Sequence, residues 1–546
     1  MIKEILEKIL NTLKKCCEKT HQNHKSDYQI RRQLFDILSK NNPNNIKEYD
    51  ISVLNEDKQD DFRQQDELFP RNEKWYLVCN KEDSKTDTLL LCDKIKDIPC
   101  NVIFNNCNID LRIDESKGMK KDNTETIKNC LYFYNCAFEK SLNLKNIIFE
   151  KTLTFNQCVF YNNLEIHQNQ FLDHLVFINC HDNQDKKITS LDLQENEFKG
   201  YFFIKNCAIE KINLWKNKFK NRCYFMDSVF GNKNNENIKL NFSNAHFEDN
   251  AYFNNSEFYN YADFHECEFD DIACFYGVKF HKIPNFSQVV LKGNFNALNI
   301  TSNFVFDDLK KQIKQEYENF NKDIKEKENK KPLDKFANDF RDSFRTFKNA
   351  LIKDNNLLDA SNFHKYELYC KEIELKNKKG KTFKDVVDRW QLLFYRKLCD
   401  HHTNLILNLK WFIVIVGFFT SILFGLRYGD GNLMQFFNKD SDLLKMLKNI
   451  LNIKALNDSN ATYLILLYSF IGLFFVRTFF IFYYLVIFIL MLAISPYNLF
   501  TMINFAIRHE TNSFLENIII IIYTLSIVLI IFSLQKTARK NSIVPS

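Results

Sequence analysis

Between about residues 101 and 291, a large apolar residue, usually Phe, recurs at every fifth or sixth position. The residues two places before these rings are mostly small, such as Ala245, Ala251 and Ala262. Steps of five and six would spread the rings around a helix of about 3.6 residues per turn, so the spacing disfavours an amphipathic helix. Each step instead predicts one large and one small side chain in a shared core. The clearest ladder is Phe242, Phe247, Phe253, Phe258, Phe264, Phe269, Phe275, Phe280 and Phe286.

This spacing resembles that of the pentapeptide-repeat family, in which a small residue stands two places before a central Leu or Phe. The alternating step of six departs from the strict five of that family. The resemblance implies a square, right-handed β-helix with both residues filling its lumen and roughly 22 residues in each coil. Coils stacked at the usual strand spacing of about 4.8 Å would form a rod roughly 35 to 40 Å long. Burial of the stacked rings would supply most of its stability.

Similar runs occur upstream, starting at Phe149 and at Phe198, and two polar segments interrupt the pattern. These segments, Asn179 to Thr189 and Gly231 to Lys239, are interpreted as loops, because solenoids tolerate insertions on one face. Before Phe133 the pattern is ragged. The repeat is therefore expected to cover residues 99–295.

The region before the repeat, residues 1–98, is expected to be mostly helical and to end in a cap. Met1 to Cys17 has no uninterrupted apolar core, so a signal peptide is not expected. Its apolar residues repeat at helical spacing, which suits either a membrane surface or packing on a second helix near Tyr28 to Leu38. Trp75 to Val78 and Thr88 to Leu91 are predicted strands that could cover the open end of the rod.

Composition limits the function more than it defines it. The chain has 546 residues, with 54 Phe but only 11 Gly and 7 Pro, and its abundant Asn, Lys and Ile suggest an AT-rich bacterial genome. The 74 basic and 68 acidic residues leave a net charge of +6, so no strong nucleic-acid surface is expected.

The 16 cysteines are interpreted as small core residues in a reducing compartment. Many of them stand two residues before a large apolar position, where the repeat needs a small side chain. There is no CxxC pair, so a zinc site is not expected. No catalytic motif is present either, which argues against an enzyme and against a bound cofactor. The cysteines at the small position are Cys107, Cys136, Cys158, Cys207, Cys223 and Cys267.

After residue 400 the sequence becomes strongly apolar. Leu405 to Leu426 carries only Lys410, which lies near its start and can reach the membrane interface. Ala461 to Phe500 carries only Arg477, and Leu515 to Leu534 is a further apolar segment. We expect four spans, with three as the alternative, in a transmembrane domain of residues 401–546. The expected spans lie near 405–426, 461–476, 478–497 and 515–534.

Basic flanks determine the expected orientation. Lys381 and Arg396 precede the first span, and Lys536 and Arg539 follow the last, so both flanks should face the cytoplasm. An even number of spans satisfies both, and a turn at Arg477 places that charge inside as well. At a cytoplasmic turn Arg477 would only set topology; at mid-membrane depth it would mark a pathway or a partner.

An ion channel is the rival hypothesis, because some pentapeptide-repeat proteins resemble this chain in carrying a C-terminal two-span channel module. A potassium filter needs consecutive backbone carbonyls after a pore helix. Here Tyr428 and Gly429 to Gly431 precede a predicted helix at Leu443 to Leu451, so the order is reversed and the five-residue filter is missing.

A helical neck is expected at residues 296–400. Residues 306–329 are highly charged and read as a solvated helix or linker. The next segment, from Phe344 to Glu374, resembles the helix-turn-helix that follows such repeats in membrane-attached relatives.

On the second helix of this hairpin several polar residues share one face. We expect Glu367 and Glu374 to pair with Arg345 and Lys348 across the hairpin. The alternative is a metal site, with ligands His364, Glu367 and Cys370.

The fold class predicted from the sequence is mixed: a right-handed β-helix, then a helical hairpin, then a helical transmembrane domain. The expected function is a non-enzymatic binding or scaffold role at a bacterial inner membrane, with both termini cytoplasmic. Its partners would be the lipid bilayer and a cytosolic protein, not nucleic acid, and a homo-oligomer is compatible with the sequence. The alternatives are a channel or transporter with a cytosolic β-helical regulatory domain, and a DNA-mimic inhibitor of a DNA-binding enzyme, which would need an acidic rod.

Overall fold

The structure is a computed structural model that divides into two compact units, residues 1–356 and 357–546. The boundary falls inside the range expected for the helical neck. Each unit is described separately. The residues described are 26–40, 42, 46, 49–71, 73–80, 88–91, 93–111, 125–181, 187–322, 330–428 and 514–539.

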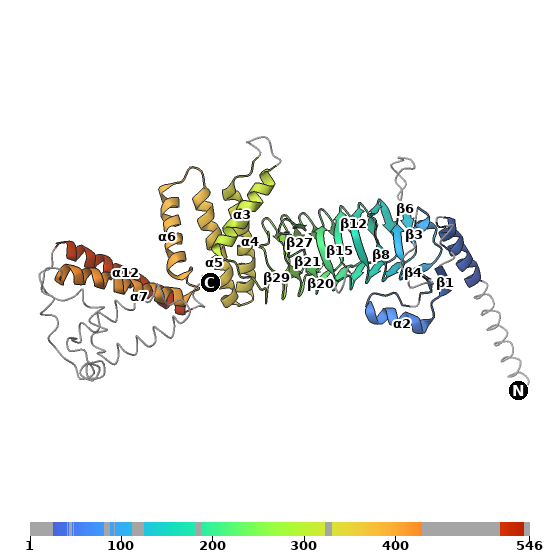
Figure 1. The fold of residues 1–546 in the computed structure, drawn as a ribbon, viewed down its shortest axis with the longest axis horizontal. Helices are drawn as coiled ribbons and strands as arrows, with labels where there is room; N and C mark the ends of the chain where they lie inside the picture. Colours follow the sequence, from blue (N-terminus) through green and yellow to red (C-terminus); the bar gives the residue numbers. More distant parts are fainter. Residues whose placement is uncertain are drawn as a thin grey trace, which may run out of the picture. The chain divides into compact units, whose positions relative to one another are not determined.

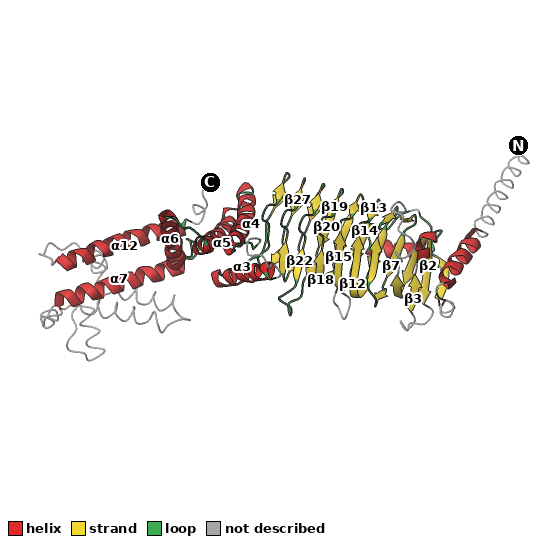
Figure 2. Cartoon of the chain, turned by 90° about the horizontal axis from the view of Figure 1, so that it is seen from above, coloured by secondary structure: helices red, strands yellow, loops and turns green. Residues whose placement is uncertain are grey.

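Three long β-sheets make up most of the first unit, and Figure 2 shows their strands as yellow bands. Eleven strands form the first sheet: β1 (Tyr49–Val53), β2 (Trp75–Asn80), β4 (Asn101–Asn105), β7 (Leu131–Tyr134), β11 (Leu153–Asn156), β14 (Leu175–Ile178), β17 (Phe202–Lys205), β20 (Cys223–Met226), β24 (Ala251–Tyr252), β28 (Ala273–Cys274) and β31 (Phe295–Asn296). Eight form the second: β6 (Glu125–Ile127), β10 (Ile147–Phe149), β13 (Gln170–Phe171), β16 (Glu197–Phe198), β19 (Lys218–Phe219), β23 (His246–Phe247), β27 (Glu268–Phe269) and β30 (Val290–Leu291). Twelve form the third: β3 (Thr88–Leu91), β5 (Asn108–Leu111), β8 (Ala137–Phe138), β9 (Leu142–Lys145), β12 (Val159–His167), β15 (Ile188–Gln194), β18 (Ala208–Asn213), β21 (Val229–Phe230), β22 (Lys239–Asn241), β25 (Glu257–Phe258), β26 (Tyr261–Asp263) and β29 (Lys279–Phe280).

We refer to strands β2 to β31 as the strand stack. Strands that follow one another along the chain mostly fall in different sheets, and within a sheet they pair in parallel. Only β1 pairs antiparallel, with β2, among the strands described. Trp75–Asn80 and Thr88–Leu91 are strands, as the sequence predicts, and they pair in parallel with β4 and β5.

The centre of the stack is filled by phenyl rings. All nine rings of the predicted ladder are buried. Phe264 stacks between Phe242 and Phe286 with centroids 4.6 Å apart on each side, and Phe253 and Phe275 stack at 4.5 Å. In this part of the stack each ring lies over the ring 22 residues earlier, so one contact geometry repeats along the core.

Polar residues with left-handed backbone angles turn the chain between strands. Asn106, Asn135, Asn206 and Asn255 all have φ near +55°. Asn adopts this region more readily than most residues because its short side chain bonds locally. From composition alone, the many Asn residues are explained by an AT-rich genome. The turns show that some of them also have a structural role.

The first end of the stack is covered by helices and a loop. A helix over residues 26–40 buries Leu34 and Leu38. Asn42 then bonds both backbone groups of Leu90 on β3, since its Oδ1 accepts from the Leu90 N–H at 2.7 Å and its Nδ2 donates to the Leu90 carbonyl at 2.8 Å. Helix α2 (Glu56–Gln65) and the loop after it pack Phe62 and Phe69 on the outer face of the first sheet. The predicted helix at the start of the chain lies outside the described residues.

The other end is covered by α3 (Phe306–Asn321) and α4 (Leu333–Lys353). The α3 segment is a helix, which is one of the two structures that the sequence predicts, but it is not solvated on all sides, because Leu309 and Ile313 lie one turn apart and are both buried. Gln312 bonds both backbone groups of Ile283, and the Ser343 hydroxyl accepts from the Phe286 N–H at 2.7 Å. These side chains satisfy backbone groups between β29 and β30 that would otherwise be open at this end of the stack.

The second unit contains α5 (Leu357–Asn377), α6 (Phe383–Cys399), α7 (Leu405–Tyr428) and α12 (Phe514–Ala538), shown in orange to red in Figure 1. Helices α7 and α12 lie antiparallel and share an apolar core built around Val416, Tyr523 and Ile527. Within the described residues, one helix, Asn517–Ala538, is long and apolar enough to cross a membrane, and Leu405–Phe419 is a shorter apolar helix. The predicted spans 461–476 and 478–497, with Arg477 between them, lie outside the described residues.

Candidate functional site

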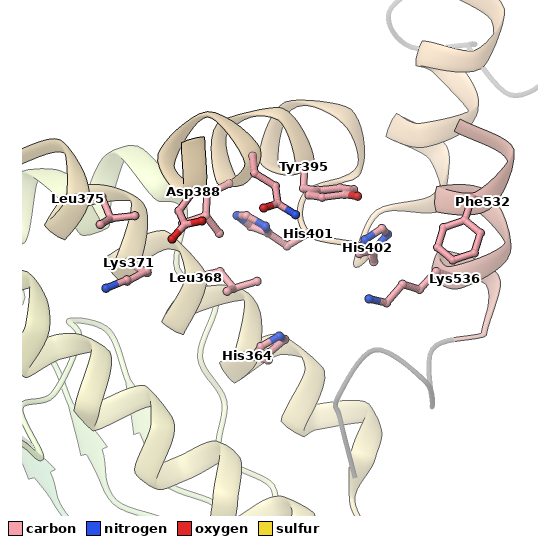
Figure 3. A pocket seen from close by; sticks show the side chains of 12 residues that line it. His364, Leu368, Lys371, Leu375, Asp388, Tyr395, His401, His402, Phe532 and Lys536 are labelled. Carbon is pink, nitrogen blue, oxygen red and sulfur yellow. The ribbon is translucent and has the colours of Figure 1, made fainter. Parts of the chain in front are cut away.

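The second unit contains a pocket of about 420 Å³. Its walls come from α5, α6, the turn between α6 and α7, and the last turns of α12, as Figure 3 shows. The mixture of histidine, lysine and leucine side chains is typical of a site that binds a ligand with both polar and apolar parts. The lining residues are His364, Leu368, Lys371, Leu375, Asp388, Gln391, Leu392, Tyr395, His401, His402, Phe532 and Lys536.

The turn between α6 and α7 has an unusual backbone. Asp400, His401 and His402 have φ values of 51°, 54° and 68°, so three consecutive residues other than glycine are left-handed. Asp and His tolerate this region better than most residues, but each still carries a conformational cost. The Tyr369 hydroxyl donates to Asp400, and Lys365 Nζ lies 3.5 Å from the same carboxylate. These contacts hold the turn in a shape that directs both histidines inward.

His401 is buried, with 3 % of its surface exposed. Its Nε2 has no hydrogen-bond partner among the described residues. Burial, followed by the nearby charge of His364, lowers the pKa of His401 to about 3. The imidazole is therefore neutral at pH 7, and its Nε2 is buried without a partner among the described residues. Such a group costs free energy unless a ligand or water satisfies it.

His402 is held by a buried polar network. Its Nδ1 lies 3.3 Å from Ser533 Oγ and 3.4 Å from Thr537 Oγ1, both on α12. Asn408 on α7 donates to the same two hydroxyl groups, at 2.9 and 3.3 Å. Burial, followed by the charge of Lys536, lowers the pKa of His402 to about 4. The network joins the start of α7 to the end of α12.

Ion pairs set the positions of the other charged groups around the pocket. Arg396 of α6 forms a bidentate, buried pair with Glu372 of α5, at 2.7 and 3.0 Å. Paired geometry of this kind fixes orientation as well as charge. Lys371 Nζ lies 2.8 Å from Glu374 Oε1. No salt bridge joins Lys536 to any other residue in the described part of the chain.

One face of α6 is apolar and exposed. Phe383 is 85 % and Trp390 64 % exposed, and Val386, Val387 and Phe394 continue the same face at helical spacing. Thr382 begins the helix with a capping box, in which its hydroxyl accepts from the Asp385 N–H and the Asp385 carboxylate accepts from the Thr382 N–H. The capping box therefore stabilises the N-terminus of the helix, although much of its apolar face is exposed.

The strand stack contains one further cluster of titratable groups. Potential metal-ligand atoms of His246, Glu268 and Asp270 all lie within 4.8 Å of one another. This is the one group of three such residues in the part of the chain that the structure describes. The ligand atoms of His364, Glu367 and Cys370, the predicted metal alternative, do not all lie within this distance of one another. Lys292 Nζ lies 2.5 Å from Glu268 Oε1 and 2.8 Å from Asp270 Oδ1. An ammonium group thus already balances the two carboxylates, and we interpret the cluster as a surface ion-pair network.

The predicted neck residues are found on the expected helices. Arg345 lies on α4, where its Nη1 is 3.1 Å from Asp342 Oδ1, and Lys348 follows it by one turn. Glu367 lies on α5 with its Oε2 3.4 Å from His364 Nδ1, and Glu374 is also on α5. Because the two helices belong to different units, the predicted pairing across the hairpin remains a prediction.

The histidine pocket was not predicted from the sequence. Its signal was the Asp400-His401-His402-Thr403 segment immediately before an apolar run, which is weak on its own. The pocket also needs residues near 533 to meet residues near 402, and nothing in the sequence indicates that contact.

No protein-family model matches this chain, and no curated protein or solved structure matches it. The resemblance to pentapeptide-repeat proteins therefore depends on residue spacing alone. Function has to be argued from the strand pairing, the apolar helices and the pocket.

Proposed function

We propose that this chain is a membrane-anchored protein whose pentapeptide-repeat β-helix acts as a non-enzymatic scaffold at the cytoplasmic face of a bacterial inner membrane. The observation that carries the proposal is the antiparallel pair of α7 and α12, whose outward side chains are large and apolar. Soluble proteins rarely leave so many uncovered, and bilayer lipid is the solvent that suits them. The exposed residues of α12 are Leu515, Ile518, Ile521, Ile522, Leu525, Val528, Leu529, Ile531 and Phe532.

Strand pairing supports the β-helix. Paired residues stand 22 positions apart in the regular part of the stack, as Asn285 and Asp263 do, which is the coil length that the family resemblance implies. The third sheet also contains two rows of pairs. One row includes Phe160 over Phe138, and the other includes Leu164 over Leu142. With the first and second sheets, these rows would make four walls.

The ends of α7 and α12 support an even number of spans. Asn408, near the start of α7, bonds Ser533 and Thr537, near the end of α12. If both helices cross the bilayer, the chain enters and leaves on one side. Lys410 and Lys536 lie at this end, so the positive-inside rule places it in the cytoplasm.

Helix α6 supports the same orientation. It precedes α7 directly and runs across the direction of α7 and α12 in Figure 1. Its exposed face, with Trp390 and Phe394, would lie in the membrane interface, where amphipathic aromatic side chains are favoured. Lys384, Arg389 and Lys397 on the same helix would reach the lipid head groups.

A scaffold role fits the polar surface of the stack. Its outward side chains form rows of mixed charge, such as Lys279 with Glu257 and Lys220 with Glu197. Such rows suit recognition of a folded protein partner, and they do not resemble the uniformly acidic surface that DNA mimicry would need.

Three measurements in bacterial cells test this proposal. The full chain should remain with the inner-membrane fraction after washing at alkaline pH, and labels added outside intact cells should reach neither terminus. Cross-linking in intact cells followed by mass spectrometry should then join surface lysines of the stack, such as Lys279, to a cytosolic protein. Release of the chain by the wash would disprove the membrane anchor, and cross-links confined to this chain would contradict the scaffold role.

A further inference from the structure

The pocket lies at the level where apolar helices meet water. Phe532 and Lys536 line it from the last turns of α12, one turn apart, and Figure 3 shows them beside His402. Phe532 is 65 % exposed and belongs to the apolar surface of the helix, whereas Lys536 belongs to its basic end. In a membrane-anchored chain, lysines at this level lie among the lipid phosphates.

The polar groups of the pocket suit an anion. Lys536 supplies a cation that no other described residue pairs, and Lys371 adds a second cation that contacts Glu374. His401 presents a buried Nε2 without a partner. Asp388 is the one carboxylate that lines the pocket. An incoming phosphate could accept from the ammonium groups of Lys536 and Lys371.

The remaining walls are apolar. Leu368 of α5, Leu392 of α6 and Phe532 of α12 line the same pocket. Their side chains would pack against the glycerol and the upper acyl carbons of a lipid, and the volume of about 420 Å³ accommodates a head group of that size. Free inorganic phosphate would use only the polar half of the site.

We propose that this pocket binds the phosphate group of an anionic phospholipid, with Lys536 and Lys371 as its cationic contacts. The inference rests on the proposed membrane anchoring and specifies where one lipid would bind. Bound lipid would join α5, α6 and α12 at the membrane surface, and so couple the lipid composition of the bilayer to the helices outside it.

Lipid titration of the purified full chain in nonionic detergent, read by native mass spectrometry, tests the proposal. The probes are phosphatidylglycerol, phosphatidylcholine and inorganic phosphate. We expect one phosphatidylglycerol per chain, bound at least tenfold more tightly than phosphatidylcholine. Lys536→Met should weaken this binding at least fivefold, whereas Lys536→Arg and the control Lys376→Met, at an exposed position of α5, should stay within twofold of the unaltered chain.

A second pocket variant keeps the test decisive if Lys536→Met does not fold. Leu392→Trp fills the pocket without changing its charge, and it should also weaken phosphatidylglycerol binding at least fivefold. Equal binding of both lipids, or unchanged binding in both pocket variants, would overturn the proposal. Tight binding of inorganic phosphate without binding of phosphatidylglycerol would show that the anion is free phosphate and would overturn the lipid assignment.

Sedimentation with phosphatidylcholine vesicles separates this inference from the proposed function. Reconstituted chain should sediment with these vesicles whether or not Lys536 is changed. If it does, and the lipids bind equally, only the pocket assignment is wrong. If the unaltered chain does not associate with any vesicle, the membrane anchor itself is wrong.

Discussion

The side-chain oxygen of Asn217 accepts a hydrogen bond from the backbone N–H of Asn196 at 2.9 Å. Asn196 repeats this contact with the N–H of Asn169, also at 2.9 Å. Each amide nitrogen donates in turn to a backbone carbonyl, as Asn196 does to Ile166 at 2.7 Å. All three residues are almost fully buried and stand two places before a core ring, so a polar residue can take the small position when its stacked neighbours satisfy it.

Replacing one member of this row should destabilise the stack. Asn196→Leu removes the acceptor for the Asn169 N–H and one of the donors to the Ile166 carbonyl, which leaves the buried Asn169 N–H without a partner. We expect a loss of about 2 to 4 kcal/mol in the free energy of unfolding, measured by denaturant titration. Asn163→Ala, at an exposed position, serves as the control and should change stability by less than about 0.5 kcal/mol.

A ring in the middle of the stack should matter more. Phe253 stacks on Phe225 at 4.6 Å and on Phe275 at 4.5 Å. Phe253→Ala should cost about 3 to 5 kcal/mol of unfolding free energy, because the neighbouring strands are hydrogen-bonded and cannot close the cavity. Phe253→Leu should cost less. If the alanine variant and the unaltered chain were equally stable in chemical denaturation, the Phe253 ring would not contribute to the stability of the stack.

Asp66 should make stability depend on pH. Burial raises its pKa to about 6; its Oδ1 accepts from the Leu68 N–H at 2.9 Å, but its Oδ2 has no described partner. The folded chain therefore holds the proton more tightly than the unfolded chain, so stability is lost as pH rises from about 3.8 to 6. Asp66→Asn keeps an acceptor for Leu68 and should raise the free energy of unfolding by about 2 kcal/mol at pH 7.5.

The same variant should bring no gain at pH 4, where the carboxyl is already protonated in the folded chain. Glu67→Gln is the matched control, since Glu67 is exposed and its contact with Lys205 is at the surface. A gain that persists at pH 4 would show that proton binding is not the cause.

His401 should have the opposite pH dependence. Its pKa is lowered to about 3 from an ordinary value of 6.5, so the unfolded chain binds the proton more tightly and stability is lost as pH falls below about 6.5. The loss from this residue should be on the order of 3 kcal/mol by pH 4. His401→Asn, which tolerates the left-handed turn, should flatten the thermal-midpoint profile between pH 6.5 and 4. An unchanged slope would contradict this assignment.

Lipid should lie against the exposed face of α6. A photo-crosslinking amino acid in place of Trp390 should form lipid adducts at least tenfold more often than one in place of Lys376, which is exposed on α5. Both are tested in the full chain in vesicles, with adducts counted by mass spectrometry. Equal yields at the two positions would remove α6 from the membrane interface.

The repeat was readable from the sequence because each core ring recurs at nearly constant spacing, and parallel pairing keeps that spacing in register. The outward apolar cluster of Val176, Ile178 and Phe203 was not readable. Outer positions of a strand are apolar only where another segment covers them, and here Leu68 does so from a distant part of the sequence. The pocket escaped prediction for the same reason, because the contact of His402 with Ser533 spans 131 residues.

Strand pairing at a separation of 22 residues, as between Asn285 and Asp263, also limits how the stack could change in length. Deleting a single residue within a strand would turn the inward side chains of that strand outward, whereas a turn can lose one residue, as the 21-residue separation of Phe198 and Phe219 shows. Removing or duplicating one 22-residue unit would leave all other pairs intact and alter the length of the stack by about 4.8 Å. Gain or loss of such units during evolution would therefore change the distance between the two capped ends in steps of constant length. The residues that cover each end would not have to change.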